Sequence, residues 1–351
     1  MILPQTFGAA LFLLILGFVC LGSWANAYKL TGTFRYELFY VDFALGVGLL
    51  AIIYAFTLGN LGFDSLSFMD DLSHAGKREW LFAVIAGIVF NLGNMLLMSS
   101  ISVSGMAVAF PAAFSMALIV STVNSMLGGG LAGESTFLLT GCALLILVIV
   151  ADAISINMLG VLRHETLARA GKTQSTRRPS SMKGVVLGVL GGFLLGAFLP
   201  LLERARDGDF GLGPYTLMVL FSVGLFLSML VFSVFFINLP VEGNPAEIRH
   251  YLRASLRTHG LGIVSGAIWC TGTLAFWVVA QTPDLLRDSR ALAFSLGHGA
   301  PLLAALWGLL VWKEFRDGDV RVKTMSVLML VFFAGGLALL ALAPAHMPKP
   351  T

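Results

Sequence analysis

The chain has 351 residues, of which 57% are hydrophobic and 12% charged, and its mean hydropathy is +0.88. Soluble domains usually carry about 25% charged residues, so the composition excludes an ordinary soluble protein and predicts one that crosses a membrane many times. The net charge is only +3, and we expect the lipid bilayer, not nucleic acid, to be the chain's large partner.

Ten apolar runs are each long enough to cross the hydrocarbon core of a bilayer, which is about 30 Å thick. The runs cover residues 5–25, 38–58, 79–100, 107–127, 135–157, 184–202, 214–238, 259–280, 292–312 and 324–343. A backbone in lipid finds no hydrogen-bond partner outside the protein, so runs of this length must be helices. The sequence therefore predicts an all-α polytopic membrane protein with ten transmembrane helices.

The first run ends in Ala25-Asn26-Ala27, which resembles a signal-peptidase site. However, residues 1–8 contain no Lys or Arg, and the run is long for a signal peptide. We therefore expect this run to remain in the mature protein as the first transmembrane helix.

The distribution of positive charge predicts the orientation, because loops rich in Lys and Arg usually face the cytoplasm. The loops after the odd-numbered runs hold 15 of the 22 Lys and Arg residues. We therefore expect these loops to be cytoplasmic, both termini to be external, and the protein to lie in the inner cell membrane.

A basic segment, 159–183, divides the chain into residues 1–158 and 184–351, each with five apolar runs. With an odd number of helices per half, the second half enters the membrane from the opposite side. This predicts two inverted five-helix repeats joined by a cytoplasmic linker. Many secondary transporters have this arrangement and bind their substrate near the membrane midplane.

Glycine spacing also relates the two halves. Gly87 and Gly93 in the third run are six residues apart, as are Gly266 and Gly272 in the eighth. The sixth run carries a stripe of glycines at every fourth position, and such a stripe predicts a tightly packed face because helices in lipid associate by close contact. The stripe consists of Gly184, Gly188, Gly192 and Gly196.

Ionisable residues inside the runs are few. Asp42 either carries a coupled proton or lies near the interface, where it caps a helix start or pairs with Lys29 or Arg35, since an unpaired carboxylate inside a membrane is costly. His298 lies between two glycines and close to Pro301, a pattern typical of an interrupted or kinked helix. It is either a proton carrier and substrate ligand or a neutral histidine bonded to a backbone carbonyl. We expect Asp152 to lie at the membrane interface.

Polar and aromatic residues of the runs predict a substrate site. Asn91 and Asn94 share one helix face, and they bind either a substrate or a neighbouring helix. Trp24 and Trp269 either stack on a planar solute or belong to interfacial aromatic belts. We add two hydroxyl side chains to this site, Thr273 beside Gly272 and Ser295 one turn from His298.

Several short segments, in this order and spacing, resemble the ureide permeases, relatives of the glucose/ribose porters in the drug/metabolite transporter superfamily. They are Leu21-Gly22-Ser23-Trp24, Asp42, Ala55-Phe56-Thr57 with Gly59, Leu92-Gly93-Asn94, Asn124, Pro301, Trp307-Gly308 and Glu314-Phe315-Arg316. The resemblance implies proton-coupled uptake of ureides such as allantoin, and of oxopurines and pyrimidines such as xanthine or uracil. The chain departs from the family pattern at Ala25, Thr273 and His298, where proline, asparagine and an amide are expected.

We therefore expect a secondary active transporter that imports a small neutral polar solute together with a proton. The alternatives, in order, are a sugar porter of the glucose, ribose or rhamnose type, a metabolite exporter, and a membrane scaffold without transport activity. The sequence contains no metal-binding cluster, nucleophile–base pair or P-loop, so we expect no enzymatic activity, cofactor or bound metal. The sequence leaves the oligomeric state open.

Overall fold

The computed structural model describes residues 1–62, 66–127, 135–169, 181–241 and 243–343, and this part of the chain contains helices but no strand. The elements are α1 (Phe7–Ser23), α2 (Asn26–Leu30), α3 (Tyr36–Phe56), α4 (Phe68–His74), α5 (Lys77–Ser104), α6 (Met106–Leu127), α7 (Ser135–Arg169), α8 (Ser181–Ala197), α9 (Leu199–Arg206), α10 (Pro214–Asn238), α11 (Ile248–Leu252), α12 (Leu256–Val279), η1 (Pro283–Ser289), α13 (Arg290–Leu306), η2 (Trp307–Val311) and α14 (Val320–Leu342). The predicted all-α fold is confirmed.

Within the described residues, ten helical segments are long and apolar enough to cross a membrane, and each overlaps one of the ten predicted runs. Polar side chains mark where several of them begin. The hydroxyl of Ser255 accepts a hydrogen bond from the backbone N–H of Thr258 (3.2 Å) at the start of α12, and Asp319 similarly caps α14. Such caps satisfy backbone donors that the first turn of a helix leaves without partners.

The chain divides into two compact units. Unit 1 contains Met1–Met95 and Ala197–Ala300, and unit 2 contains Leu96–Gly196 and the described residues from Pro301 onward. Each unit therefore combines segments from both halves of the sequence. The predicted division at 159–183 remains a prediction, and residues 170–180 of that linker lie outside the described part of the chain.

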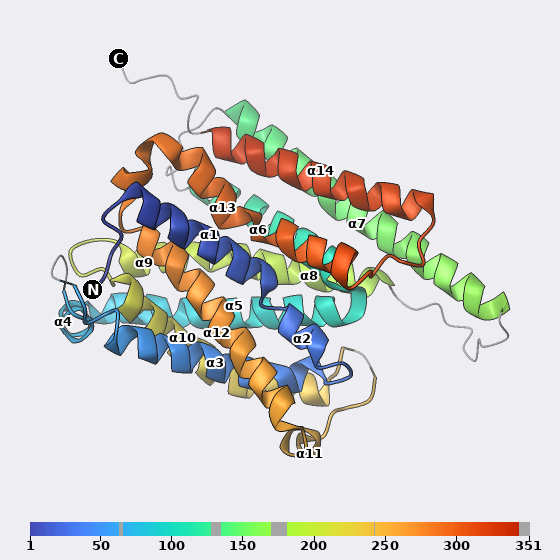
Figure 1. The fold of residues 1–351 in the computed structure, drawn as a ribbon, viewed down its shortest axis with the longest axis horizontal. Helices are drawn as coiled ribbons and strands as arrows, with labels where there is room; N and C mark the ends of the chain where they lie inside the picture. Colours follow the sequence, from blue (N-terminus) through green and yellow to red (C-terminus); the bar gives the residue numbers. More distant parts are fainter. Residues whose placement is uncertain (63–65, 128–134, 170–180, 242, 344–351) are drawn as a thin grey trace. The chain divides into compact units, whose positions relative to one another are not determined.

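Helix α12 organises unit 1 (Figure 1). It packs against α1, α2 and α3, and α3 also packs against α10. Two pairs of helices in this unit approach until backbone touches backbone. In the first glycine crossing, a Cβ atom at Gly266 of α12 would overlap the carbonyl oxygen of Phe43, and a Cβ at Gly46 of α3 would overlap that of Ile263.

The second glycine crossing repeats this geometry between α10 and α5. A Cβ at Gly87 of α5 would overlap the carbonyl oxygen of Phe221, and a Cβ at Gly224 of α10 would overlap that of Val84. The two residues of α10, Phe221 and Gly224, each follow their counterparts in α3, Phe43 and Gly46, by 178 residues. The two residues of α12, Ile263 and Gly266, each follow their counterparts in α5, Val84 and Gly87, by 179. The contacts therefore correspond residue by residue.

Unit 2 contains α7 packed against α14 and α6 (Figure 1). The predicted glycine stripe of α8 is a packed face, as expected. A Cβ at Gly192 would overlap the carbonyl oxygen of Ala113 in α6, and one at Gly196 would lie 2.7 Å from that of Ala117. Because the glycines have no side chains, α8 lies directly on the backbone of α6.

The turn between α5 and α6 is a single residue, Gly105, with a φ of +90° that other residues rarely adopt. A Cβ at this position would also lie 2.6 and 2.7 Å from the two carboxylate oxygens of Glu314. That carboxylate accepts hydrogen bonds from the backbone N–H groups of Met106 (2.9 Å) and Ala107 (2.8 Å). Glu314 therefore caps α6, where a negative charge also favours the helix dipole.

Two local features bear on the expectations. Helix α13 is not interrupted at His298, because it continues through Pro301 to Leu306, and the irregular π-helical turn η2 comes only afterwards. Asp152, for which we expected a place at the membrane interface, is 1% exposed inside unit 2, and its depth in the membrane stays a prediction. A hydropathy pattern cannot distinguish burial in protein from proximity to the membrane surface.

Replacing Gly266 by alanine should destabilise the protein, because the added Cβ must displace the backbone of α3. Overpacking of this kind costs about 1–3 kcal/mol, which thermal unfolding in detergent would detect as a lower midpoint. Gly260→Ala in the same helix is the control, since no atom lies within 4 Å of its added Cβ. Equal unfolding midpoints for the two variants would contradict the close helix contact.

Candidate functional site

A buried group of aromatic rings occupies unit 1. We call it the aromatic cluster, and it consists of Trp24, Tyr40, Phe43, Phe90, Phe221 and Trp269. Trp269 contacts three of the rings, with centroids 4.7 Å from Phe90 and 6.1 Å from both Phe43 and Phe221. The ring of Phe221 lies nearly parallel to it, at 16°. Trp269 therefore lies at the centre of the cluster.

Trp24 joins the cluster through Phe43. The centroids of these two rings are 5.1 Å apart, and Tyr40 contacts Phe43 at 5.0 Å. The backbone carbonyl of Trp24 accepts a hydrogen bond from Ser265 of α12 at 2.9 Å, which fixes the end of α1. The structure thus brings Trp24 and Trp269 together around one phenylalanine, although they are far apart in sequence.

The two predicted asparagines lie on α5 and are both buried. The Nδ2 group of Asn94 donates to the hydroxyl of Tyr40 (3.1 Å), and that of Asn91 donates to Ser228 (2.7 Å). Asn94 therefore contacts the aromatic cluster directly. The Oδ1 atom of Asn91 is buried, and no described residue donates a hydrogen bond to it.

Thr273 lies one helical turn after Trp269 on α12 and is 8% exposed. Its hydroxyl is also buried without a partner. Leaving a buried polar atom unpaired costs about 1–3 kcal/mol, and such atoms in a native protein call for an explanation. Asn91 follows Phe90 on α5, and Thr273 follows Trp269 on α12, so each unpaired group lies on a helix that also supplies a ring of the cluster.

Asp42 lies on α3 and its side chain is 3% exposed. Its Oδ1 accepts a hydrogen bond from the hydroxyl of Tyr251 (2.7 Å), and its Oδ2 lies 2.8 Å from Nδ1 of His259. Arg35, one of the two expected partners, instead pairs with Glu37 (2.6 Å) and donates to the carbonyl of Asn244. We call Asp42, Tyr251 and His259 the Asp42 triad.

Sequence reasoning did not single out Tyr251 or His259. A signal was nevertheless available, since Asp42 lies near the start of the second run and His259 begins the eighth. The charge rule places both of these ends on the cytoplasmic side. A carboxylate and a histidine at the same depth in a membrane are candidates for pairing.

Ser295 and His298 lie on α13 and are half-buried. The Nδ1 atom of His298 lies 3.0 Å from the carbonyl oxygen of Phe294, and the two rings stack at 4.3 Å. A carbonyl can only accept, so Nδ1 must carry the proton. This is the backbone contact that we considered as one alternative, and in the described residues it links His298 only to its own helix.

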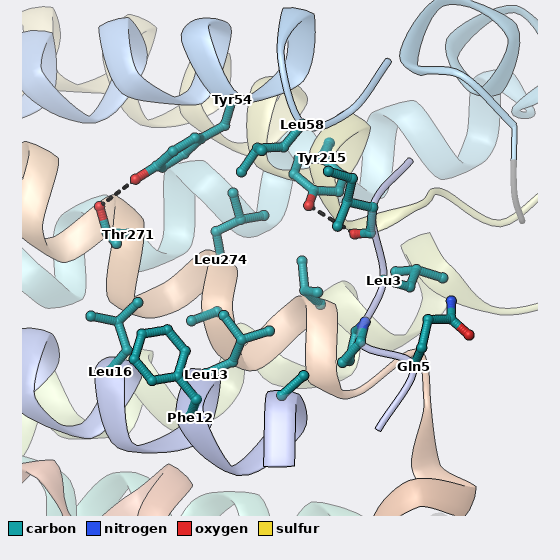
Figure 2. A pocket seen from close by; sticks show the side chains of 15 residues that line it. Leu3, Gln5, Phe12, Leu13, Leu16, Tyr54, Leu58, Tyr215, Thr271 and Leu274 are labelled. Atoms are coloured by element: carbon teal, nitrogen blue, oxygen red, sulfur yellow. Dashed lines mark hydrogen bonds between the residues drawn. The ribbon is translucent and has the colours of Figure 1, made fainter. Parts of the chain in front are cut away.

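A cavity of about 330 Å³ opens elsewhere in unit 1 (Figure 2). Its lining is mainly apolar and comes from the N-terminal stretch, α1, α12 and the ends of α3 and α10 that lie near it. Its hydroxyl groups are engaged, because Tyr54 and Thr271 bond to each other (3.0 Å) and Tyr215 donates to the carbonyl of Ile2 (2.9 Å). None of the predicted site residues, all of which are described, lines this cavity.

Comparisons with known proteins found relatives over nearly the whole chain. Ureide permease 1 of Arabidopsis thaliana is 22% identical, with 99% of this chain and 100% of the relative covered. Ureide permease 4 is 23% identical over 95% and 96% of the two chains, and ureide permease 5 is 24% identical over 95% and 94%. These relatives are permeases rather than enzymes, in agreement with the expectation for this chain.

No protein-family model matches the chain. One solved crystal structure aligns with 96% of this chain and 98% of its own, at 16% identity and a TM-score of 0.48, a similarity too low to support an argument. The full-length similarity to permeases agrees with the ten apolar helices. The chain is therefore a multi-pass membrane transporter that resembles the ureide permeases.

Proposed function

We propose that the protein imports a small neutral polar solute, a ureide or a nucleobase such as allantoin, uracil or xanthine, by proton symport across the inner cell membrane. The observation that carries this proposal is the full-length similarity to several permeases named for ureides. The buried aromatic cluster with its unpaired polar atoms supports it.

The chemistry of the proposed site suits this class of solute. Ureides and nucleobases have flat, uncharged rings with several N–H and C=O groups, so they stack on aromatic rings and form many hydrogen bonds. Trp24 and Trp269 would provide the stacking surfaces. Asn91, Asn94 and Thr273 would form the hydrogen bonds, and Ser295 and His298 would complete the site from α13.

The two glycine crossings support the proposal of two inverted five-helix repeats, residues 1–158 and 184–351. One aromatic contact follows the same correspondence. Phe43 contacts Trp269, and the equivalent Phe221 contacts Phe90 (5.2 Å), which precedes Trp269 by 179 residues. In inverted-repeat transporters the substrate binds between the repeats and is released by their relative movement, which would separate these rings.

The linker and the loops that follow the odd-numbered runs would lie in the cytoplasm, and both termini would lie outside the cell.

Purified protein in proteoliposomes should produce a transient inward positive current when allantoin, uracil or xanthine is added, because a neutral solute brings a proton with it. The current should be larger at about pH 6 than at about pH 8, on either side of the ordinary histidine pKa. Ribose, glucose and rhamnose, added in the same way, are the comparison solutes. A response only to sugars would contradict the proposed substrate class.

Thr273→Val should separate a binding role from a structural one. Valine has nearly the same shape, and the lost hydroxyl has no partner among the described residues, so the unfolding midpoint should not fall. If the hydroxyl binds the solute, the apparent affinity for allantoin should fall about tenfold, the effect of losing one hydrogen bond. Ser228→Ala, which removes the acceptor of Asn91, should instead lower the unfolding midpoint. Unchanged affinity in Thr273→Val would remove Thr273 from the site.

A further inference from the structure

The Asp42 triad connects three helices of unit 1. Asp42 lies on α3, Tyr251 on the short helix α11, and His259 in the first turn of α12. An ionised carboxylate only accepts hydrogen bonds, so the Tyr251 hydroxyl and His259 Nδ1–H both donate to it. Since Nδ1 of His259 holds its proton in this bond, Nε2 is the ring atom at which a further proton can be gained or lost.

Exposure differs between the two ionisable partners. The side chain of Asp42 is 3% exposed, whereas that of His259 is 22% exposed. His259 therefore links a buried carboxylate to the protein surface. The hydrogen bond from Nδ1 to Asp42 does not involve Nε2, so the contact is the same with or without a proton on Nε2.

The triad is present at only one of the two equivalent glycine crossings. The positions that correspond to Asp42 and His259 in the second crossing are Leu220 and Trp80, which do not ionise. Gly262, whose added Cβ would overlap the Cβ of Asp42, corresponds to Ala83. The helix packing therefore does not require an ionisable pair at this place. At the first crossing, Gly262 has no side chain and leaves space for Asp42.

Other charged groups near the triad have their own contacts or are exposed. On α3, Glu37 pairs with Arg35, and Tyr40 accepts from Asn94. Arg257, two residues before His259, is exposed. Helix α2, which packs against α12, contributes Tyr28 and Lys29. Tyr215 of α10 lies instead beside Ile2, in the cavity that Tyr54 also lines. Burial, followed by the hydrogen bond to Asp42 and the charge of Asp42, raises the pKa of Tyr251, so its hydroxyl remains a donor near neutral pH.

We propose that Asp42 and His259 form the proton-binding site of the transport cycle, with Nε2 of His259 exchanging the coupled proton with solvent and Asp42 stabilising the imidazolium. The proton adds to Nε2 in one state and leaves from the same atom in another, so no further reactant is needed. This inference rests on the proposed proton symport. His298 is the weaker candidate because its Nδ1 is bonded to the backbone of Phe294 rather than to a carboxylate.

The test compares two modes of allantoin transport in proteoliposomes. Counterflow exchanges labelled for unlabelled allantoin and requires no net proton movement, whereas accumulation uses an imposed pH gradient. With one proton per solute, a gradient of about one pH unit sustains up to about tenfold accumulation. His259→Gln and Asp42→Asn should each keep counterflow but reduce accumulation to equal concentrations on both sides. Their uptake should also lose its dependence on pH.

Two further variants serve as controls. His250→Gln removes an exposed histidine of α11 and should accumulate allantoin as wild type does. Asp152→Asn removes a buried carboxylate of unit 2 whose oxygens have no hydrogen-bond partner, and it should also retain accumulation. Loss of accumulation in Asp152→Asn together with full accumulation in His259→Gln would move the proton site to Asp152 and overturn the inference.

The remaining outcomes are also decisive. Full gradient-driven accumulation by His259→Gln would overturn the inference. Loss of counterflow in both His259→Gln and Asp42→Asn would also overturn it, because the pair would then have a structural role. Wild-type protein that exchanges allantoin but never accumulates it would show that proton symport is wrong. Wild-type protein that does neither would show that allantoin is not its substrate, and in both cases the inference falls with the proposed function.

Discussion

The close approach of helix backbones at glycine is the constraint on which unit 1 depends. At each of the two crossings, a glycine of one helix lies against a carbonyl oxygen of the other, so even a methyl group would not fit. Helices in lipid gain little from burying apolar surface, and close van der Waals contact replaces that driving force. The crossings bring α3, α5, α10 and α12 close enough for their aromatic side chains to form one cluster.

The aromatic cluster uses residues that also build the glycine crossings. Phe43 and Phe221 supply the carbonyl oxygens of the crossings and also the rings that contact Trp269. Oδ1 of Asn91 and the hydroxyl of Thr273, on helices that carry these rings, have no hydrogen-bond partner among the described residues. A core selected only for stability would avoid such atoms, which is why we propose that they bind the solute.

The Asp42 triad differs from the rest of the first glycine crossing. The glycine contacts of that crossing recur at the second one, but the triad does not. Where the chain uses the same contact twice, the shared residues are explained by packing. Where one copy has an aspartate and a histidine and the other has Leu220 and Trp80, packing offers no explanation. The cost of placing an ionisable pair in a membrane protein is then most simply attributed to function.

The sequence by itself determined the all-α class, the ten spans and the glycine face of α8, because these depend on local composition and helical period. It also predicted that Trp24, Trp269 and Asn94 belong to one site, and the structure places all three in or against the aromatic cluster. Only the tertiary structure decided what surrounds them, since Phe43, Phe90 and Phe221 look like ordinary apolar residues in sequence. The partner of Asp42 is His259, 217 residues away, and no local pattern encodes a contact that arises only when α3 and α12 cross.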